Sequence, residues 1–319
     1  MKKKILFINP WNYGGMKHYS ESLIKIIQNK KEYNLFYRTK FQLRYLFKVN
    51  PFAIHINSGH PFLILFYPLF FFYNSIITIH DAKSHEGESL LKVIYHKIHL
   101  LFIYLFINKI VVHSELIKQE LPFYFKNKKI YIMPHVNYNL LSKNTSKVVK
   151  KDSKFNILFF GRILKYKGVD YLIKAFESLS SKKYRLTIAG EGKLPSNIKL
   201  IKHIDIKNKY ISDKLMNELF IRSDVVVCPY ISASQSGVIY ASFAYNKPVI
   251  ATKVGAITEV VKDKFNGILV EPKSSEKLKN AIKEISNPKL YNKLVNNIKN
   301  QEESSDNEIL KKLEIIYSD

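Results

Sequence analysis

Short apolar runs rich in β-branched residues recur along the chain, and stretches with the spacing of amphipathic helices separate them. The runs are KILFINP, AIHIN, SIITIHD, KIVVHS and KIYIMPH in the first half, and FNILFFGR, RLTIAGEG, SDVVVCPY and KPVIATKVG in the second. Continuous apolar runs that alternate with helices are typical of parallel strands covered on both faces. The expected fold class is therefore α/β, with two doubly wound parallel sheets.

The chain has 319 residues, enough for two domains that each bury a core. We expect a first Rossmann-like domain over 1–142, a second over 155–290, and a helical segment over 291–319 with the option of packing back on the first domain. Residues 143–154 are polar and charged and lack apolar periodicity, which predicts a linker. The two domains are expected to face each other across a cleft at the carboxyl ends of their strands, where open α/β sheets bind ligands.

The chain is strongly basic, because 51 Lys and Arg against 26 Asp and Glu give a formal net charge of +25. Such a balance favours an anionic partner, either a phosphorylated substrate or an anionic membrane surface. The alternative is that the positive charge only reflects an overall composition rich in Lys, Asn and Ile and marks no binding surface. Aromatic residues cluster in apolar runs and do not interleave with basic residues, so no nucleic-acid partner is expected. The lone Cys228 lies in an apolar run and is expected to pack there.

Two stretches, 61–73 and 100–107, are strongly apolar but too short to cross a bilayer. They are expected either to form buried helices or to offer an apolar face that rests, with basic neighbours, on an anionic membrane. No signal peptide is evident, because the apolar run after the basic start is short and no small-residue cleavage site follows. We therefore expect a cytoplasmic protein, in solution or attached peripherally to the inner face of the cell membrane.

Basic residues follow the strand expected at 155–160. Arg162, Lys165 and Lys167 lie in a turn and at the start of a helix, which apolar residues repeating over 169–179 predict. The positive end of the helix dipole lies there, so clustered cations are unfavourable unless an anion binds between them. We expect Arg162 and Lys167 to bind a phosphate, with a solvated basic loop as the alternative.

The segment CPYISASQSGVIYASFAYNKPVIAT, residues 228–252, has the form of a ligand-binding turn between a strand and a helix, yet it contains no acid and no histidine. Ser236 is expected to cap the helix, and Gly237 and Val238 follow it. Because Gly237 has no side chain, backbone N–H groups can approach an anion closely there. The segment is suited to binding a phosphate rather than to acid chemistry.

His80 and Asp81 follow a strand of the first half, are expected at the edge of the cleft, and are the expected catalytic residues. A structural role at the strand end is the alternative for both. His80 could ligate zinc only together with His85 and Glu86, and no second ligand pair is evident. No metal site is therefore expected.

Three further features of the first half are weaker signals. Gly14 and Gly15 stand in the turn after the first strand, where a small backbone suits either close approach to a phosphate or acceptor, or a plain tight turn. His113 and His135 also follow strands, and we expect both to be structural. Neither this turn nor AGEGKLPSN has the G-x-G-x-x-G pattern, which counts against a nicotinamide enzyme, and no cofactor is expected.

Taken in order, these pieces resemble the retaining glycosyltransferases of family four, which have the GT-B fold. GR followed five residues later by KG, then LIKAF, IAGEG, SDVVVCPY, GVIYASFAYNKPVIAT, GAITEVV and NGILVEP occur in that family's order and spacing. NYGGMKHYSESL, TIHD, VVHSE and MPHVNY also fall where the family's motifs do, so the resemblance covers about residues 4–271. It implies two Rossmann-like domains and a nucleotide-sugar donor.

The resemblance implies that Arg162 and Lys167 grip the diphosphate of that donor and that His80 lies by the donor sugar. The departing nucleoside diphosphate gains negative charge in the transition state, and fixed cations with a helix N-terminus can stabilise it without a metal. The chain contains no D-x-D triplet, which counts against a metal-dependent GT-A enzyme.

The chain also departs from most of the family, which has two glutamates eight positions apart that contact the donor sugar and the ribose. Ala233 and Ala241 occupy those places, and the QSGV that includes Gln235 resembles a subset of the family that lacks both acids. This implies changed donor contacts, with an inactive relative as the alternative. The resemblance also puts Ile211 near the nucleobase and matches Glu259 to a recurrent acid without a derived role.

We therefore expect a metal-independent, retaining hexosyl- or related glycosyltransferase. It would move a sugar from a nucleotide-sugar donor to a glycan or lipid-linked glycan in bacterial surface polysaccharide biosynthesis. The alternative is a non-catalytic GT-B subunit that binds nucleotide-sugar or glycan and scaffolds a partner transferase.

Overall fold

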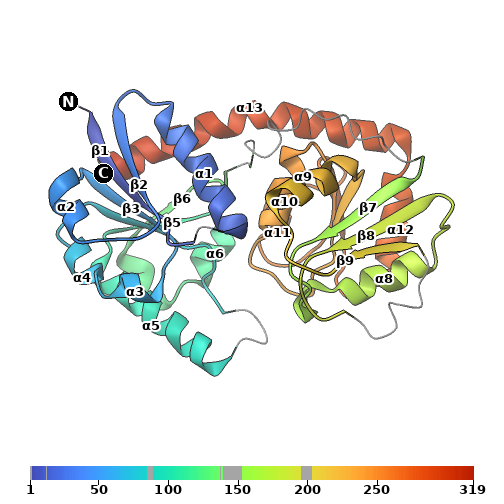
Figure 1. Cartoon of the computed structure of the whole chain (residues 1–319), viewed down its shortest axis with the longest axis horizontal. Helices are drawn as coiled ribbons and strands as arrows, with labels where there is room; N and C mark the ends of the chain where they lie inside the picture. Colours follow the sequence, from blue (N-terminus) through green and yellow to red (C-terminus); the bar gives the residue numbers. More distant parts are fainter. Residues whose placement is uncertain (1, 12, 85–88, 137, 139–152, 195–202) are drawn as a thin grey trace. The chain divides into compact units, whose positions relative to one another are not determined.

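The structure, a computed structural model, describes residues 2–11, 13–84, 89–136, 138, 153–194 and 203–319. The chain forms two compact units: unit 1 is Met1–Asn137 with Glu303–Asp319, and unit 2 is Tyr138–Glu302. Each unit contains one parallel sheet, with six strands among the described residues (Figure 1). The expected α/β class with two doubly wound parallel sheets is confirmed.

The sheet of unit 1 has the strand order β2-β1-β3-β4-β5-β6, so the order reverses between β1 and β3. Its strands are β1 (Lys3–Ile8), β2 (Tyr33–Arg38), β3 (Ala53–Asn57), β4 (Ser75–Thr78), β5 (Lys109–Val112) and β6 (Lys129–Ile132). The helices are α1 (Gly14–Gln28), α2 (Arg44–Val49), α3 (Pro61–Ile64), α4 (Tyr67–Phe70), α5 (Leu90–Phe106), α6 (Glu115–Glu120) and η1 (Phe123–Asn127).

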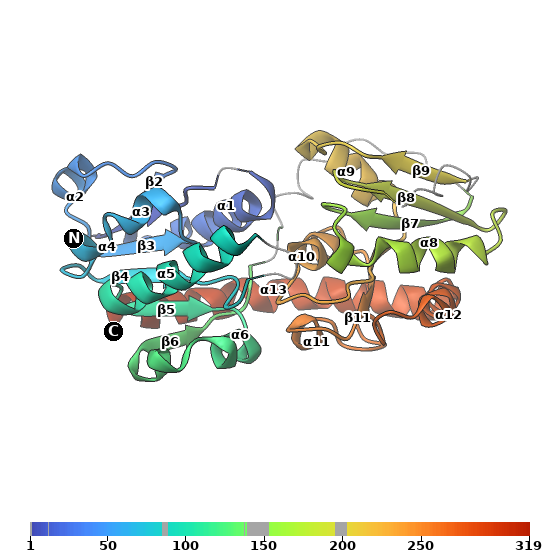
Figure 2. The ribbon, with the colours of Figure 1, turned by 90° about the horizontal axis from the view of Figure 1, so that it is seen from below.

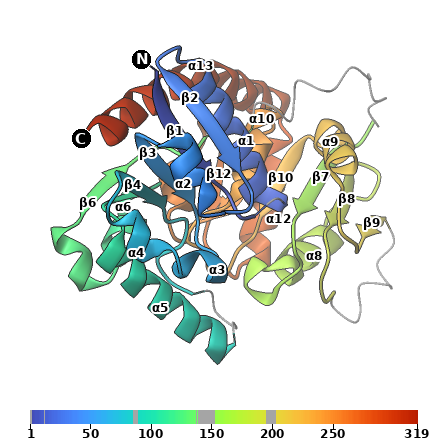
Figure 3. The same ribbon diagram turned by 60° about the vertical axis from the view of Figure 1, so that its left-hand side comes forward.

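Alternate residues of the unit 1 strands reach opposite faces of the sheet, as the pleat requires. Ile54 and Ile56 of β3 pack in one core with Ile103 of α5, while His55 between them reaches the other face. Figures 1 and 3 show α3, α4 and α5 along the first face and α1 with the end of α13 along the second. Both faces of the sheet are thus covered, and β3, β4 and β5 are buried along their whole length.

The sheet of unit 2 has the order β12-β11-β10-β7-β8-β9, so the order reverses between β7 and β10. Its strands are β7 (Phe155–Phe160), β8 (Tyr184–Ala189), β9 (Ile204–Lys207), β10 (Val225–Cys228), β11 (Val249–Thr252) and β12 (Gly267–Val270). The helices are η2 (Lys165–Lys167), α8 (Val169–Glu177), α9 (Asp213–Arg222), α10 (Gly237–Ala244), α11 (Ile257–Val260), α12 (Ser275–Ile285) and α13 (Pro288–Ser318).

The sheet of unit 2 is also packed on both faces. Phe159 of β7 lies in a core with Leu172 of α8 and Ile282 of α12. Phe160, the next residue, contacts Phe220 of α9 on the other face, with ring centroids 5.1 Å apart. Figure 2 shows β7, β8 and β9 side by side, with α8 along β7.

Helix α13 belongs to both units, because the division between them falls at residues 302 and 303. Its end is fixed in unit 1 by polar contacts as well as by packing. The Tyr317 hydroxyl lies 2.8 Å from His55 Nδ1, and Lys109 donates to the Ile316 carbonyl at 2.8 Å. The expected C-terminal segment over 291–319 therefore forms part of one helix that begins at Pro288.

Three strands escaped the sequence analysis: β2, β9 and β12. Each lies at an edge of its sheet. Residues of β2 and β9 are mostly half-buried, so their sequences carry polar residues and lack the continuous apolar run of a central strand. Most of the expected linker, 143–152, lies outside the described residues.

The apolar stretches 61–73 and 100–107 are neither wholly buried nor long. Tyr67, Phe70 and Ile103 are buried, whereas Phe72 is 81% and Leu101 44% exposed. Among the described residues, no helix has both the length and the apolar character needed to cross a bilayer.

The His55–Tyr317 contact allows a test of how much the end of α13 stabilises unit 1. Burial lowers the pKa of His55 to about 3, so the ring is neutral, and it also lies 2.9 Å from Thr78 Oγ1. Tyr317→Phe should reduce the free energy of unfolding by about 1–3 kcal/mol, because it leaves a buried ring nitrogen without its partner. Denaturant unfolding measures this, with Tyr210→Phe at a 66% exposed site as the control. Equal effects of the two substitutions would contradict the expectation.

Candidate functional site

The loops that follow β7 and β10 meet where the strand order of unit 2 reverses. At such a switch point the loops diverge to opposite faces, which leaves room for a ligand at the carboxyl ends of the strands. The loop after β7 carries Arg162 and Lys167, and the loop after β10 leads through Tyr230 to Ser236 at the start of α10. These are the residues that the sequence assigned to phosphate binding, together with one tyrosine that it did not.

Lys167 is held by the loop after β10. Its Nζ donates to Tyr230 Oη at 3.1 Å and lies 4.5 Å from the centre of the Tyr230 ring. Tyr230 Oη in turn lies 3.0 Å from Ser236 Oγ. The ammonium, the phenol and the serine hydroxyl therefore form one chain of hydrogen bonds that joins the two loops.

The local backbone brings these loops into direct contact. Gly168, which precedes α8, has φ +64°, and a Cβ there would lie 2.0 Å from the Pro229 carbonyl oxygen. A Cβ at Gly161 would lie 3.5 Å from Lys167 Nζ and 3.7 Å from Val238 Cγ2. Only glycine fits at Gly168, and the lysine, Gly161 and the first turn of α10 face the same space.

The two cations of this site, Lys167 and Arg162, repel each other. Burial, together with a smaller contribution from the neighbouring charge of Arg162, lowers the pKa of Lys167 to about 8. The Arg162 side chain is exposed. An anion bound between them would relieve this repulsion and restore the lysine pKa, which is the behaviour expected of a phosphate site.

Helix α10 presents its N-terminus to the same loops. Ser236 is the N-cap residue, as expected, but its hydroxyl makes no capping hydrogen bond and lies against Tyr230 instead. The first N–H groups of a helix have no partner within it, so those of Gly237 and Val238 are suited to an anion. Gly237 lies against the Tyr138 hydroxyl, since a Cβ there would be 2.9 Å from it.

The other expected donor residues are spread over unit 2. Ala233 and Gln235 lie in the loop before α10, and the Ala233 carbonyl packs against Gly255 before α11. Ala241 is buried within α10. Glu259 lies on α11, and burial first, then the charge of Glu259, raises the pKa of Tyr240. Separately, Ile211 is half-buried in the loop between β9 and α9.

The expected residues of unit 1 lie at the carboxyl edge of its own sheet. Gly14 and Gly15 form the first residues of α1 rather than a turn before it. His80 follows β4, is 8% exposed, and donates through Nε2 to Asn57 Oδ1 at 2.8 Å. Burial, and next the neighbouring His113, hold its pKa well below the usual histidine range, so the ring is neutral. Asp81 is half-buried beside it.

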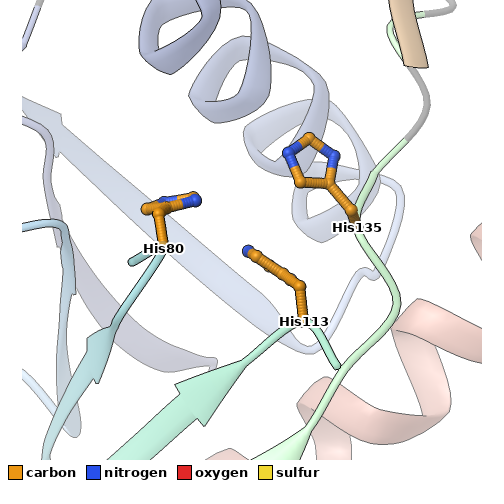
Figure 4. A group of neighbouring side chains, drawn as sticks. All are labelled: His80, His113 and His135. Carbon is orange, nitrogen blue, oxygen red and sulfur yellow. The ribbon is translucent and has the colours of Figure 1, made fainter. Parts of the chain in front are cut away.

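Sequence reasoning missed a cluster around His80. His113 follows β5 and His135 follows β6, and both were expected to be structural, yet both lie beside His80 (Figure 4). A partial signal was present, because IHD, VHS and PH mark the ends of three successive strands, and the sheet places these strands side by side as β4-β5-β6. His85 and Glu86, weighed as zinc ligands, lie outside the described residues.

A family comparison and similar curated proteins both relate this chain to glycosyltransferases. The family described as glycosyl transferases group 1 matches residues 142–301, about half of the 319 residues. A glycosyltransferase of Methanocaldococcus jannaschii is 32% identical over 187 residues, which are 56% of this chain and 50% of that protein. The chain spans about half or less of the length of the curated relatives that it matches first.

Solved structures share the whole fold at low sequence identity. Sucrose-phosphate synthase of Thermosynechococcus elongatus has a TM-score of 0.72 and 17% identity, with 99% of this chain and 98% of that chain covered. HepE of Anabaena, solved in complex with UDP-glucose, has a TM-score of 0.69 and 15% identity, with 98% of each chain covered. These structures have the GT-B architecture of two parallel-sheet units.

The depressed pKa of Lys167 predicts how binding of a nucleoside diphosphate depends on pH. The protonated lysine attracts the anion, so affinity should be constant below the free pKa of about 8 and fall as the pH rises above it. The loss should be up to about tenfold per pH unit, until the pKa of the complex is reached. Calorimetry with UDP between pH 7.5 and 9.5 measures this. Lys167→Arg keeps its charge and should remove the dependence; the same slope in that variant would refute the assignment to Lys167.

Proposed function

Because the chain belongs to the glycosyl transferases group 1 family, we propose that it transfers a sugar from a nucleotide-sugar donor to a glycan or lipid-linked glycan acceptor. The observation that carries the proposal is the cationic site of unit 2, in which Lys167 is held against Tyr230 and Ser236 beside Arg162. The diphosphate of the donor would bind there, in contact with the Arg162 and Lys167 side chains and the N-terminus of α10. Gly14 and Gly15 at the head of α1 are proposed as further diphosphate-binding residues.

The charges act on the leaving group. When the bond between the sugar C1 and the phosphate oxygen breaks, negative charge grows on the diphosphate, and Arg162 and Lys167 would stabilise it without a metal ion. We propose that the sugar is transferred with retention, by attack of the acceptor hydroxyl on the same face. Its proton then passes to the departing phosphate oxygen, so no carboxylate nucleophile is required. Ala233 and Ala241, where most family-four members have acids, suit this mechanism.

His80 and Asp81 are proposed as the catalytic residues, with His80 by the donor sugar as the resemblance implies. His80 is neutral and oriented by Asn57, so its ring can hydrogen bond a sugar hydroxyl without adding charge. Ile211 is proposed near the base and Gln235 near the donor sugar. HepE binds UDP-glucose, which makes UDP-glucose the first donor to test and UDP the first nucleotide to test for binding. Surface polysaccharide assembly in a bacterium is the proposed setting.

Substitution of the two cations tests the proposal. Arg162→Ala and Lys167→Ala should each lower sugar transfer at least about tenfold, because a hydrogen bond to a charged group contributes about 1.5–3 kcal/mol. Initial rates with a panel of nucleotide-sugars measure this, and Lys174→Ala, an exposed lysine of α8, is the matched control. Wild-type rates in both variants would remove the diphosphate assignment.

The lack of acids at Ala233 and Ala241 favours a second candidate, a non-catalytic subunit that binds nucleotide-sugar and scaffolds a partner transferase. The same assays separate the two. Binding of UDP-glucose that Arg162→Ala weakens, without hydrolysis or transfer by the wild-type chain, would support the subunit. Turnover by the isolated chain would support the enzyme.

Unit 1 carries an apolar surface suited to a membrane. Exposed apolar residues of α5 recur every three or four positions and form one stripe, and further exposed residues come from the neighbouring α3–α4 segment. We define the apolar surface by Phe62, Leu65, Phe72, Leu91, Ile94, Ile98, Leu101 and Leu105. Lys92 and Lys97 are also exposed on α5. We propose that this surface rests on an anionic membrane where a lipid-linked acceptor is met.

Vesicle sedimentation tests the membrane proposal. The chain should sediment with anionic vesicles and be released by salt, because each basic residue at the surface contributes about 1 kcal/mol and the attraction is screened within about 8–10 Å. The double variant Leu91→Asn, Ile98→Asn should reduce sedimentation severalfold, whereas Phe265→Asn, a 39% exposed site in unit 2, should not. Binding to neither anionic nor neutral vesicles would favour a soluble acceptor.

A further inference from the structure

Three buried histidines of unit 1 converge at the ends of three neighbouring strands. His80 follows β4, His113 follows β5 and His135 follows β6, and one ring nitrogen of each lies within 4.8 Å of those of the others. Figure 4 shows the three rings reaching from these strand ends toward a common space. Tyr19 of α1 packs edge-on against all three, with ring centroids 4.8–5.2 Å away. The cluster is thus enclosed by the core of unit 1.

The outer nitrogen of each ring is held by an acceptor. His113 Nδ1 donates to the Met133 carbonyl at 3.0 Å, and His135 Nδ1 donates to the Val136 carbonyl at 2.9 Å. A carbonyl only accepts, so both Nδ1 atoms carry the proton and both Nε2 atoms carry a lone pair. His80 Nε2 donates to Asn57 Oδ1, which leaves its lone pair on Nδ1. Backbone or side-chain acceptors behind a histidine are the usual support of metal ligands.

His113 supplies the observation that points to a missing partner. It is 8% exposed, and its Nε2 has no hydrogen-bond partner among the described residues. A buried acceptor without a donor costs about 1–3 kcal/mol, so such an atom requires an explanation.

We propose that His80, His113 and His135 bind one divalent transition-metal ion, with zinc as the ion that best suits them. Imidazole is the common ligand of zinc, and three histidines leave a fourth position open for water or a hydroxyl. Zinc–nitrogen bonds of about 2.0–2.1 Å place tetrahedral ligand atoms about 3.4 Å apart. The three ligand nitrogens would therefore have to move about 1 Å closer to one another, which small side-chain rotations allow. All ligands come from unit 1, so the site is independent of the donor site in unit 2.

Metal uptake by the untagged, full-length chain tests this inference. After removal of metals with a chelator and gel filtration, Zn²⁺ should bind with a stoichiometry of one per chain in calorimetry and raise the melting midpoint by mass action. Co²⁺ should give the ligand-field absorption of a nitrogen-ligated ion, and Zn²⁺ should displace it. A wild-type chain that takes up neither ion would overturn the proposal.

The ligands are tested by His113→Gln and, should that variant fail to fold, by His135→Gln. Either should weaken Zn²⁺ binding at least about tenfold. Loss of a group that hydrogen bonds to a metal ligand already lowers metal affinity about 10–100-fold, and loss of the ligand itself lowers it more. His99→Gln is the matched control, because His99 is also buried in unit 1 and lies 2.9 Å from the Tyr67 hydroxyl, outside the cluster. Equal Zn²⁺ affinity in the wild type and in a folded ligand variant would place the ion elsewhere and refute the assignment.

Discussion

Parallel pairing of every strand is the constraint on which both sites depend. Within each sheet all described pairs are parallel, so all strands end at one edge, and residues that follow different strands become neighbours there. In unit 2 this edge joins the loops of Lys167 and Tyr230; in unit 1 it joins the ends of β4, β5 and β6. The chemistry differs because one edge carries cations and the other neutral rings.

The central strands could be predicted from the sequence because a strand covered on both faces has a continuous apolar run. The edge strands β2 and β9 could not, since an edge strand tolerates polar residues and its sequence resembles a loop, and β12 was missed although its four residues are apolar. The amphipathic period of α8 fixed its start at Val169, as observed, and its end came two residues before Leu179.

The candidate donor site followed from residue types at strand ends, but its internal contacts did not. The sequence indicated Arg162, Lys167 and Ser236, yet it gave no reason to expect that Tyr230 would join the last two. His113 and His135 were assigned to packing because each was judged alone in its own motif. Their significance lies in a distance between strand ends, which becomes visible only when the strand order β4-β5-β6 is known.

The two roles considered for His80 compete for the same lone pair. With Nε2 donating to Asn57, a neutral His80 has only Nδ1 to offer, either to the proton of an acceptor hydroxyl or to a metal ion. A metal-bound His80 could not accept a hydrogen bond from that hydroxyl. Retaining transfer in which the departing phosphate takes the acceptor proton does not require this hydrogen bond, so it is compatible with an occupied metal site. An open fourth metal position would then place a polarising charge at the strand ends of unit 1, where the neutral rings alone provide none.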